Sequence, residues 1–508
     1  MIFNRKSADP HPAAASAAVW THDALTESEW VVRAHELGAA RLDLISLWSN
    51  GRFVYMATYD VESGRLSIGA LACPHGRFPS VARLHPPALR LERTIQDLYG
   101  LKADGIPDER PWLDHGRWGV RRPCADAAAL ASEVDPYAFL PAEGEALHQI
   151  PVGPVHAGII EPGHFRFSAN GEIVVRLEQR LGFVHKGVDR LMRGATLSDA
   201  ARLAGRVSGD STVAYSSAFA CAVEAACDVA PPPRAAALRV VMAELERLAN
   251  HFGDIGAICN DAAFALVHAH TSIVREKILR AAKVCFGHRL MMDCVIPGGV
   301  AHDLAPDGVS QLRELMEWIA PLIPRLIALY GDTTSIQDRT VSTGIVEPSL
   351  AAQYAAGGFV GRASGRRFDA RKNVGYGVYP DLAFDIGGSQ EGDVDARVWV
   401  RFDEIRESLK LIAQILDAAP DGGVHSPFNA KSASARDGVA LVEGFRGDIF
   451  AWLRLNADGS VAHCHLRDPS WFQWPLLEAA IKNNIVADFP LCNKSFNCSY
   501  SGLSLIHI

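Results

Sequence analysis

The sequence offers little that marks a membrane-spanning, nucleic-acid-binding or nucleotide-dependent protein. No apolar stretch reaches about 18 residues without a charge or a proline, so a spanning helix is not expected. Lys and Arg number 50 against 58 Asp and Glu, and this acidic balance disfavours contacts with phosphate backbones. The motifs G-x-G-x-x-G, G-x-x-x-x-G-K-[ST], H-E-x-x-H and G-x-S-x-G are all missing, so no nicotinamide fingerprint is present and contact with NAD is not expected.

Paired cysteines are also missing. The chain has 10 cysteines, but no two of them form a C-x-x-C pair. Such pairs are the usual source of thiolate ligands for soft metals. Unpaired cysteines in a cytosolic protein are mostly reduced, buried and inert, and that is our expectation for all of them.

A length of 508 residues favours two or more domains. The pattern predicts an α+β protein with a small α+β domain and a larger, mainly α-helical domain with short β-sheets. The expected divisions are a loose leader at 1–20, an α+β domain at 21–120, a linker at 121–150, the large domain at 151–502 and a tail at 503–508 that reads like a translated sequencing adapter.

Within these divisions, periodicity predicts individual elements. Strands are expected at 52–59, 65–68, 173–175 and 449–453, and long helices at 310–330, at 402–417 and from Arg234 onward. The last of these helices carries apolar residues at steps of three and four, which favours packing into the core: Leu238, Val241, Leu245, Leu248 and Phe252. His463 and His465 alternate along another expected strand. Two histidines alone are weak evidence for a metal, so we interpret this strand as a surface strand.

Several segments together indicate a family. The run 181–191 (LGFVHKGVDRL) resembles the 49-kDa subunit of respiratory complex I and the large subunit of group 4 nickel–iron hydrogenases. The likeness continues through Glu244-Leu245-Glu246-Arg247, Pro297-Gly298-Gly299-Val300 and Arg362-Ala363-Ser364-Gly365, and residues 92–115 resemble the 30-kDa subunit of complex I. Both parts in one chain resemble the large subunit of the formate hydrogenlyase type.

The chain departs from this family at its metal ligands. Nickel–iron hydrogenases hold their metals with four thiolates from two C-x-x-C pairs, and a hydroxyl cannot replace a soft thiolate there. The matching positions here are Ser208, Ser211, Ser499 and Gly502, with Cys498 one residue out of register. We therefore expect no nickel–iron site, and no metal or cofactor bound by this chain itself.

Four other polar positions of the family are kept. Glu161 matches a glutamate that resembles a proton gate, and Arg446 matches an arginine poised over the hydrogenase metals. Asp254 matches an aspartate that lines the quinone pocket of complex I, and His156 matches the first histidine of the complex I loop Gly-Pro-x-His. A buried carboxylate beside a histidine or arginine can pass protons, but the same residues could form an inherited structural ion-pair network, and both interpretations stay open.

The quinone site itself resembles that of complex I less well. Its second histidine is replaced at about Ile160. Its tyrosine has no clear equivalent, since Gly209 falls near its place and Tyr215 lies six residues on. These differences reduce the support for a quinone site, which stays open as an alternative.

The resemblance implies a large subunit of a membrane-associated redox complex of the formate hydrogenlyase or complex I type, without a nickel–iron site. Its expected partners are a small subunit that carries an iron–sulfur cluster and antiporter-like membrane subunits, and it would couple electron transfer to proton or ion movement. The expected location is the cytoplasmic face of the cell membrane, held there by the partners. Two alternatives remain: a quinone reductase subunit of the NADH dehydrogenase type, and a non-catalytic scaffold of an ion-transporting complex.

Overall fold

A computed structural model describes residues 20–116, 118–125, 129–130 (backbone only), 136–144, 146–156 and 160–503. The predicted leader at 1–20 and the tail at 503–508 lie outside the described residues, apart from Trp20 and Leu503. Among the helices of the described part, none has both the length and the apolar character needed to cross a membrane.

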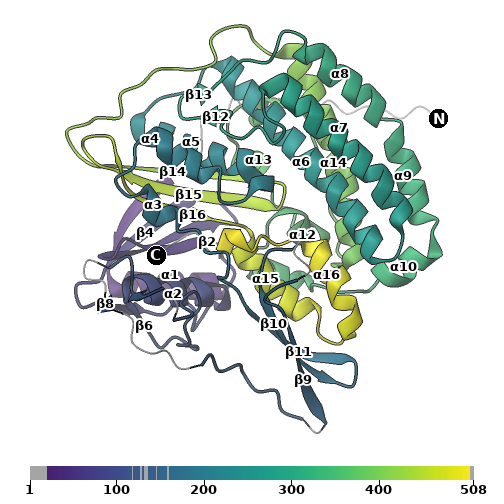
Figure 1. Cartoon of the computed structure of the whole chain (residues 1–508). Helices are drawn as coiled ribbons and strands as arrows, with labels where there is room; N and C mark the ends of the chain where they lie inside the picture. Colours follow the sequence, from purple (N-terminus) through teal and green to yellow (C-terminus); the bar gives the residue numbers. More distant parts are fainter. Residues whose placement is uncertain are drawn as a thin grey trace, which may run out of the picture.

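The N-terminal part is a four-stranded sheet with two helices on one face (Figure 1). The strand order is β1-β4-β3-β2, with β1 parallel to β4 and the other pairs antiparallel. Its elements are β1 (Trp20–Leu25), α1 (Glu27–Gly38), β2 (Leu42–Ser49), β3 (Phe53–Asp60), β4 (Leu66–Ala72) and α2 (Leu89–Tyr99). Alternation along β3 directs Val54 and Met56 toward the helices and Tyr55 to the opposite face.

That opposite face packs on a second sheet, so the two parts share a core. The second sheet is antiparallel with the order β14-β15-β16: β14 (Arg436–Gly444), β15 (Gly447–Leu455) and β16 (Val461–Arg467). Trp48 and Tyr55 from the first sheet meet Phe450 and Trp452 from the second. The helix α5 (Thr212–Cys227) covers the other face of the second sheet.

A bundle of long helices flanks α5. It contains α6 (Pro233–Asp261), α7 (Ala265–Phe286), α8 (Gly308–Ile319), α9 (Leu322–Gly331), α10 (Thr334–Thr340) and α14 (Val394–Ala418). Helix α6 begins with Pro233 in its first turn, where the missing N–H has no partner in any case. The predicted apolar face of this helix is confirmed, since all five of its residues are buried. Charged residues on α6, among them Glu244 and Arg247, are buried as well.

A three-stranded sheet projects from the body beside the C-terminal helices (Figure 1). It comprises β9 (Leu147–Val152), β10 (His164–Asn170) and β11 (Ile173–Arg180), in the order β11-β10-β9. The C-terminal elements are α15 (Ser470–Ala480), α16 (Phe489–Phe496) and the 3-10 turn η5 (Ser501–Leu503). Helix α15 packs on β11, and Asp468 just before it bonds to Tyr215 near the start of α5.

Short elements complete the described part. The short strands are β5 (Arg77–Pro79), β6 (Lys102–Asp104), β7 (Val120–Arg121), β8 (Ala129–Leu130), β12 (Val295–Ile296) and β13 (Gly299–Val300). The short helices are α3 (Val188–Met192), α4 (Leu197–Ala204), α11 (Pro348–Gln353), α12 (Gly358–Ala363) and α13 (Ala370–Asn373). The 3-10 turns are η1 (Pro86–Ala88), η2 (Gly209–Ser211), η3 (Tyr379–Asp381) and η4 (Val486–Asp488).

Three local predictions need correction. The single helix expected at 310–330 is two helices, because Pro321 lies between α8 and α9. The helix expected at 402–417 begins at Val394, where the Asp393 carboxylate caps the Ala396 N–H at 2.8 Å. The β16 strand is not a surface strand at His465, which is 6% exposed, because the N-terminal sheet covers it.

Candidate functional site

The first pair of ligand-equivalent serines lies where the chain enters α5. Ser208 precedes the turn η2, and Ser211 ends it. Both hydroxyls donate to one carboxylate oxygen of Asp210, at 2.6 Å from Ser208 Oγ and 3.1 Å from Ser211 Oγ. Asp210, which lies between the two serines in the sequence, therefore binds both of their hydroxyls.

Arg446 lies opposite this carboxylate. It comes from the tight turn between β14 and β15, and its Nη1 and Nη2 donate to the two oxygens of Asp210 at 2.9 and 2.5 Å. Burial by itself would raise the pKa of Asp210. The Arg446 charge and the Ser208 and Ser211 hydroxyls outweigh burial and lower the pKa to about 2, so this aspartate is a stable anion.

Arg446 also reaches the C-terminal segment, two residues before the ligand-equivalent Ser499. Its Nη1 donates to Ser211 Oγ at 3.0 Å, and its Nε donates to the backbone carbonyl of Asn497. The guanidinium is thus a bridge between the two chain segments that would each supply a pair of metal ligands. Its side chain is only 5% exposed, so the space between those segments holds an ion pair.

The last ligand-equivalent position has no room for a side chain. A Cβ at Gly502 would lie 2.6 Å from Cγ of Asp468, well inside van der Waals contact. Asp468 is fixed there, because it accepts from Tyr215 OH at 2.5 Å and from the Ser470 N–H at 2.8 Å. The Ser499 hydroxyl accepts the Gly502 N–H at 2.9 Å, so it closes a turn of its own chain.

These donors do not fit a nickel–iron centre. The four ligand-equivalent positions carry two hydroxyls that donate to Asp210, a third hydroxyl that closes a turn, and a glycine. A nickel–iron centre needs soft thiolates at these positions. The neighbouring thiol of Cys498 is buried near Gln473 Oε1, and burial raises its pKa well above the usual range. Among the described residues, no group of three or more His, Cys, Asp or Glu side chains is arranged to hold a metal ion.

Glu161 joins the cluster and His156 does not. The Glu161 carboxylate accepts the Ser501 N–H at 3.2 Å, beside the Ser499 turn. The Nε2 of His156 instead lies 2.6 Å from the Gly163 carbonyl, within its own loop before β10. Ile160, the position of the second quinone histidine, forms a bridge with His156 in the same loop. Tyr215 is buried against Asp468.

Asp254 is connected to this cluster through Asn497. Its carboxylate pairs with Arg401 on α14 at 3.1 Å and accepts from Asn497 Nδ2 at 2.8 Å. Because the Asn497 carbonyl binds Arg446, this single asparagine connects Asp254 to the Asp210–Arg446 pair.

Buried charges continue from Arg401 along α14. Glu404, one turn on, pairs with His251 at 2.8 Å and with Arg362 at 2.6 Å. Burial would raise the pKa of Glu404, but Arg362 and His251 hold it well below the usual range. Arg362 also binds Glu443 on β14 at 3.0 Å. Positive and negative groups therefore alternate across the protein interior.

The same network ends near η3. Glu244 on α6 pairs with Arg247 at 3.2 Å and with Arg371 at 3.0 Å, and it accepts from Tyr379 OH at 2.6 Å. All of these side chains are buried. Removing one partner of such a pair leaves an uncompensated buried charge. The charged residues of this network therefore depend on one another for stability.

Two buried carboxyls in this region have pKa values near neutrality. Burial raises the pKa of Glu246 to about 8, although it accepts the N–H groups of Val213 and Ala214 at the start of α5. Burial together with the Asp369 charge raises the pKa of Glu443 to about 7, against the effect of Arg362. These two groups can gain or lose a proton near pH 7.

The sequence reasoning missed four functional candidates: Asp210, Glu246, Glu443 and Asp468. Asp210 could have been found, because it stands between the two serines of the altered ligand motif. The other three depend on burial and on contacts far apart in the chain, which no local pattern shows.

Comparison with known proteins gives two family matches. Residues 262–440 match the family described as "Respiratory-chain NADH dehydrogenase, 49 Kd subunit", and residues 32–133 match the family described as "Respiratory-chain NADH dehydrogenase, 30 Kd subunit". The order of these two matches along the chain agrees with the fusion expected from the sequence.

Individual relatives extend over most of the chain. "Formate hydrogenlyase subunit 5" of Escherichia coli is 30% identical over 438 residues, which cover 84% of this chain and 76% of the relative. "Carbon monoxide-induced hydrogenase" of Rhodospirillum rubrum is 30% identical over 355 residues, 69% of this chain and 97% of the relative. An NADH-quinone oxidoreductase subunit of Bacteroides thetaiotaomicron is 27% identical, with 82% and 83% covered. The chain belongs to the family of complex I 49-kDa and group 4 hydrogenase large subunits, joined to a domain of the 30-kDa subunit type.

Proposed function

We propose that this chain is the large subunit of a membrane-associated redox complex in which an ion pair stands where relatives hold nickel and iron. In this complex the chain binds no metal of its own, and the iron–sulfur cluster lies in a neighbouring subunit. Antiporter-like subunits hold the assembly on the inner face of the membrane. The chain passes the charge change at the cluster onward to proton or ion movement.

The Asp210–Arg446 pair is the single observation that carries this proposal. It joins the two segments that would each supply two metal ligands, and its contacts use Ser208 and Ser211, two of the four positions. At Gly502, Asp468 fills the space that a ligand side chain would need. The loss of thiolates is thus matched by other residues that stabilise the changed site.

Metal analysis of the native complex tests this part. We expect iron in proportion to the partner's cluster and no stoichiometric nickel in this chain. Infrared spectra should show no carbonyl or cyanide bands. One nickel per chain, or those bands in the intact complex, would refute the proposal.

Transmission of charge is supported by the alternating network from Asp210 to Glu244. A change of charge next to Arg446 is felt at Asp254 through Asn497 and at Glu404 through Arg401, because these groups lie in a low-dielectric interior. Glu246 and Glu443 can respond by exchanging a proton, since the pKa of each lies near 7.

A scaffold is the second candidate, and the closed ion-paired site favours it. Asp254→Asn separates the two, because it keeps the shape and removes the charge that pairs with Arg401. In membrane vesicles that hold the native complex, transmission predicts that electron transfer persists while ion movement falls at least about tenfold. Unchanged ion movement, with the complex still assembled, would leave only the scaffold. The same assay with an added ubiquinone analogue tests the quinone reductase alternative directly.

A further inference from the structure

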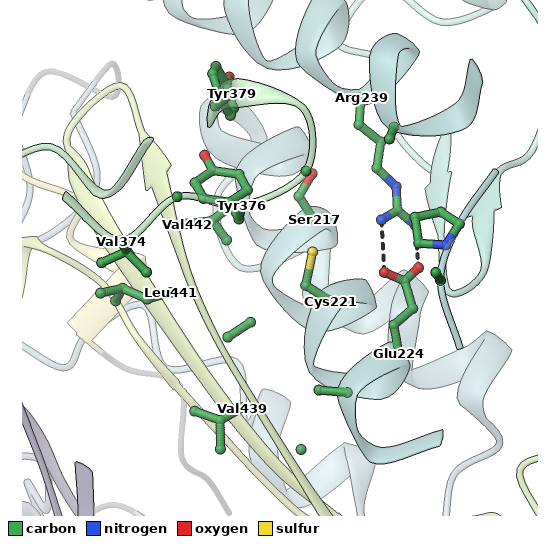
Figure 2. Close-up of a pocket in the computed structure, with 18 of the residues that line it drawn as sticks. Ser217, Cys221, Glu224, Arg239, Val374, Tyr376, Tyr379, Val439, Leu441 and Val442 are labelled. Carbon is green, nitrogen blue, oxygen red and sulfur yellow. Dashed lines mark hydrogen bonds and ion pairs between the residues drawn. The ribbon is translucent and has the colours of Figure 1, made fainter. Parts of the chain in front are cut away.

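A cleft of about 600 Å³ lies along β14, and its lining includes Glu443 and Tyr379 from the charge network described above. Every residue from 437 to 443 lines it, together with residues of α5, α6 and the loop before η3. Trp20 and His22 of β1 line it too. Figure 2 shows Val439 and Leu441 on one side of this β14 cleft, and Ser217 and Cys221 of α5 on the other.

Within the described residues, β14 is an edge strand, because its sheet has the order β14-β15-β16. Both the odd-numbered and the even-numbered residues of this stretch line the cleft. Side chains of an edge strand alternate between faces, so a cavity touched by all of them lies against the backbone edge itself. Such an edge presents unpaired N–H and C=O groups.

Two observations identify which backbone groups face the cleft. Gly444 and Gly447 flank the two-residue turn between β14 and β15 and form a hydrogen-bonded pair. Hydrogen-bonded pairs recur at every second residue of an antiparallel ladder, so the backbone groups of Val442 and Ala440 also bond to β15. The intervening Glu443 N–H points the other way and donates to Tyr376 OH at 3.0 Å. Leu441 and Val439 lie two and four residues before Glu443, so their N–H and C=O groups point in the same direction as those of Glu443 and face the cleft.

The cleft walls indicate what the occupant is like. Small residues line it on the helix side: Ala214, Ala225, Ala236 and Ala243. Three of its four carboxylates are matched by arginines, Glu224 with Arg239, Asp437 with Arg454 and Glu443 with Arg362, and the fourth, Asp228, is exposed to solvent. The interior is therefore neutral, and Ser217 Oγ, on a residue 7% exposed, has no hydrogen-bond partner among the described residues. An uncharged occupant with backbone-like donors and acceptors fits this interior.

We propose that an extended segment of a partner subunit, with small uncharged side chains, pairs with the free edge of β14 at Val439 and Leu441. The seven lining residues span about 23 Å at about 3.3 Å per residue, enough for a short added strand. Strand addition of this kind derives affinity from main-chain hydrogen bonds and specificity from the side-chain walls. The names of the relatives describe subunits of larger assemblies, and such an assembly supplies the second chain.

Amide hydrogen exchange in the intact native complex and in the separated full chain tests this proposal. We expect the Val439 and Leu441 amides to exchange at least about tenfold more slowly in the complex than in the chain alone. Ala440 and Val442 are the matched controls, because their amides bond to β15 in both samples. Equal exchange of Val439 and Leu441 in the two samples would overturn the proposal. Slow exchange in the separated chain that becomes fast when residues 1–19 are removed would also overturn it, because the occupant is then part of this chain.

A proline variant gives an independent test. Val439→Pro removes an N–H that faces the cleft and leaves the bonds to β15 intact, which an edge strand tolerates. We expect the variant chain to keep its melting temperature within a few degrees and to lose the extra protection of Leu441 in the complex. Ala440→Pro, which removes a bond to β15, should instead lower the melting temperature. Full protection of Leu441 in the Val439→Pro complex would contradict the proposal.

Discussion

Arg446 binds both carboxylate oxygens of Asp210, and the same guanidinium reaches Ser211 Oγ and the Asn497 carbonyl. One arginine thus connects the start of α5, the turn between β14 and β15, and the C-terminal segment. In a hydrogenase of this family, metal–thiolate bonds would connect the first and last of these segments. Here charge-assisted hydrogen bonds do so.

Arg446→Met should destabilise the fold. The variant keeps the length of the side chain but leaves Asp210 without its counter-charge and the Asn497 carbonyl without a donor. Asp210 keeps about a third of its exposure, so water offsets part of the loss. We expect the free energy of unfolding to fall by about 2–3 kcal/mol, measured by urea denaturation.

The matched control is Arg206→Met. Arg206 and Asp293 form an ion pair 40% and 42% exposed, and its loss should cost less than about 1 kcal/mol. The double variant Asp210→Asn/Arg446→Met should recover part of the loss, because no charge is left unpaired. Equal costs for Arg446→Met and Arg206→Met would show that the Asp210–Arg446 pair has no structural role.

Gly502→Ala should be costly for a residue near the end of the described chain. Its Cβ would approach the Asp468 carboxyl carbon to 2.6 Å, and Tyr215 and Ser470 prevent Asp468 from moving aside. We expect a loss of about 1–3 kcal/mol in a thermal melt. Gly423→Ala is the control, because a Cβ there has no atom within 4 Å. A neutral Gly502→Ala would mean that this position can still accept a ligand side chain.

The sequence predicted the elements whose signals are local. The apolar steps of α6 and the strand signal at 52–59 are local, and both predictions agree with the structure. The prediction of a single helix at 310–330 is wrong, because Pro321 separates two helices. Burial of the strand around His465 depends on the N-terminal sheet more than 400 positions away, which no window along the chain can include.

The candidate site shows the same division. Missing thiolates at Ser208 and Ser211 are visible in the sequence, because the motif around them is kept. The Asp210–Arg446 pair beside these serines is not visible, since the two residues are 236 positions apart. Similarly, Glu161 reaches the cluster through a backbone N–H of Ser501, a contact that depends on the fold and not on the residue type.

His465→Ala should weaken the contact between the two sheets. The His465 ring stacks on Trp48 with centroids 5.2 Å apart, and its Nε2 lies 2.8 Å from Ser46 Oγ. Truncation removes the stacking and leaves a buried hydroxyl without a partner, so we expect a loss of about 2–4 kcal/mol. His463→Ala on the same strand is the control and should cost much less, because His463 is partly exposed. Similar melting temperatures for the two variants would contradict the expected role of His465.

Glu246→Gln should flatten the pH dependence of stability above pH 5. The ordinary pKa of a glutamate side chain is 4.5, and burial raises the pKa of Glu246 in the folded protein to about 8. Between these values the folded state holds a proton that the unfolded state has released. The free energy of unfolding therefore falls as pH rises, by up to about 1.4 kcal/mol per pH unit from this group, and the fall stops above the folded pKa.

Glutamine stays neutral at every pH, so the variant should lose this slope and be more stable than the wild type at pH 8. Near pH 4, where Glu246 is protonated in the folded state and mostly protonated in the unfolded state, the two proteins should differ little. Urea denaturation at half-unit steps from pH 4 to pH 9 measures both curves, and other titrating groups cancel in their difference. A difference that does not change with pH would show that Glu246 is ionised in the folded protein. The carboxylate would then be a permanent charge at the start of α5, and of the two carboxyls Glu246 and Glu443 the second alone would exchange a proton near neutrality.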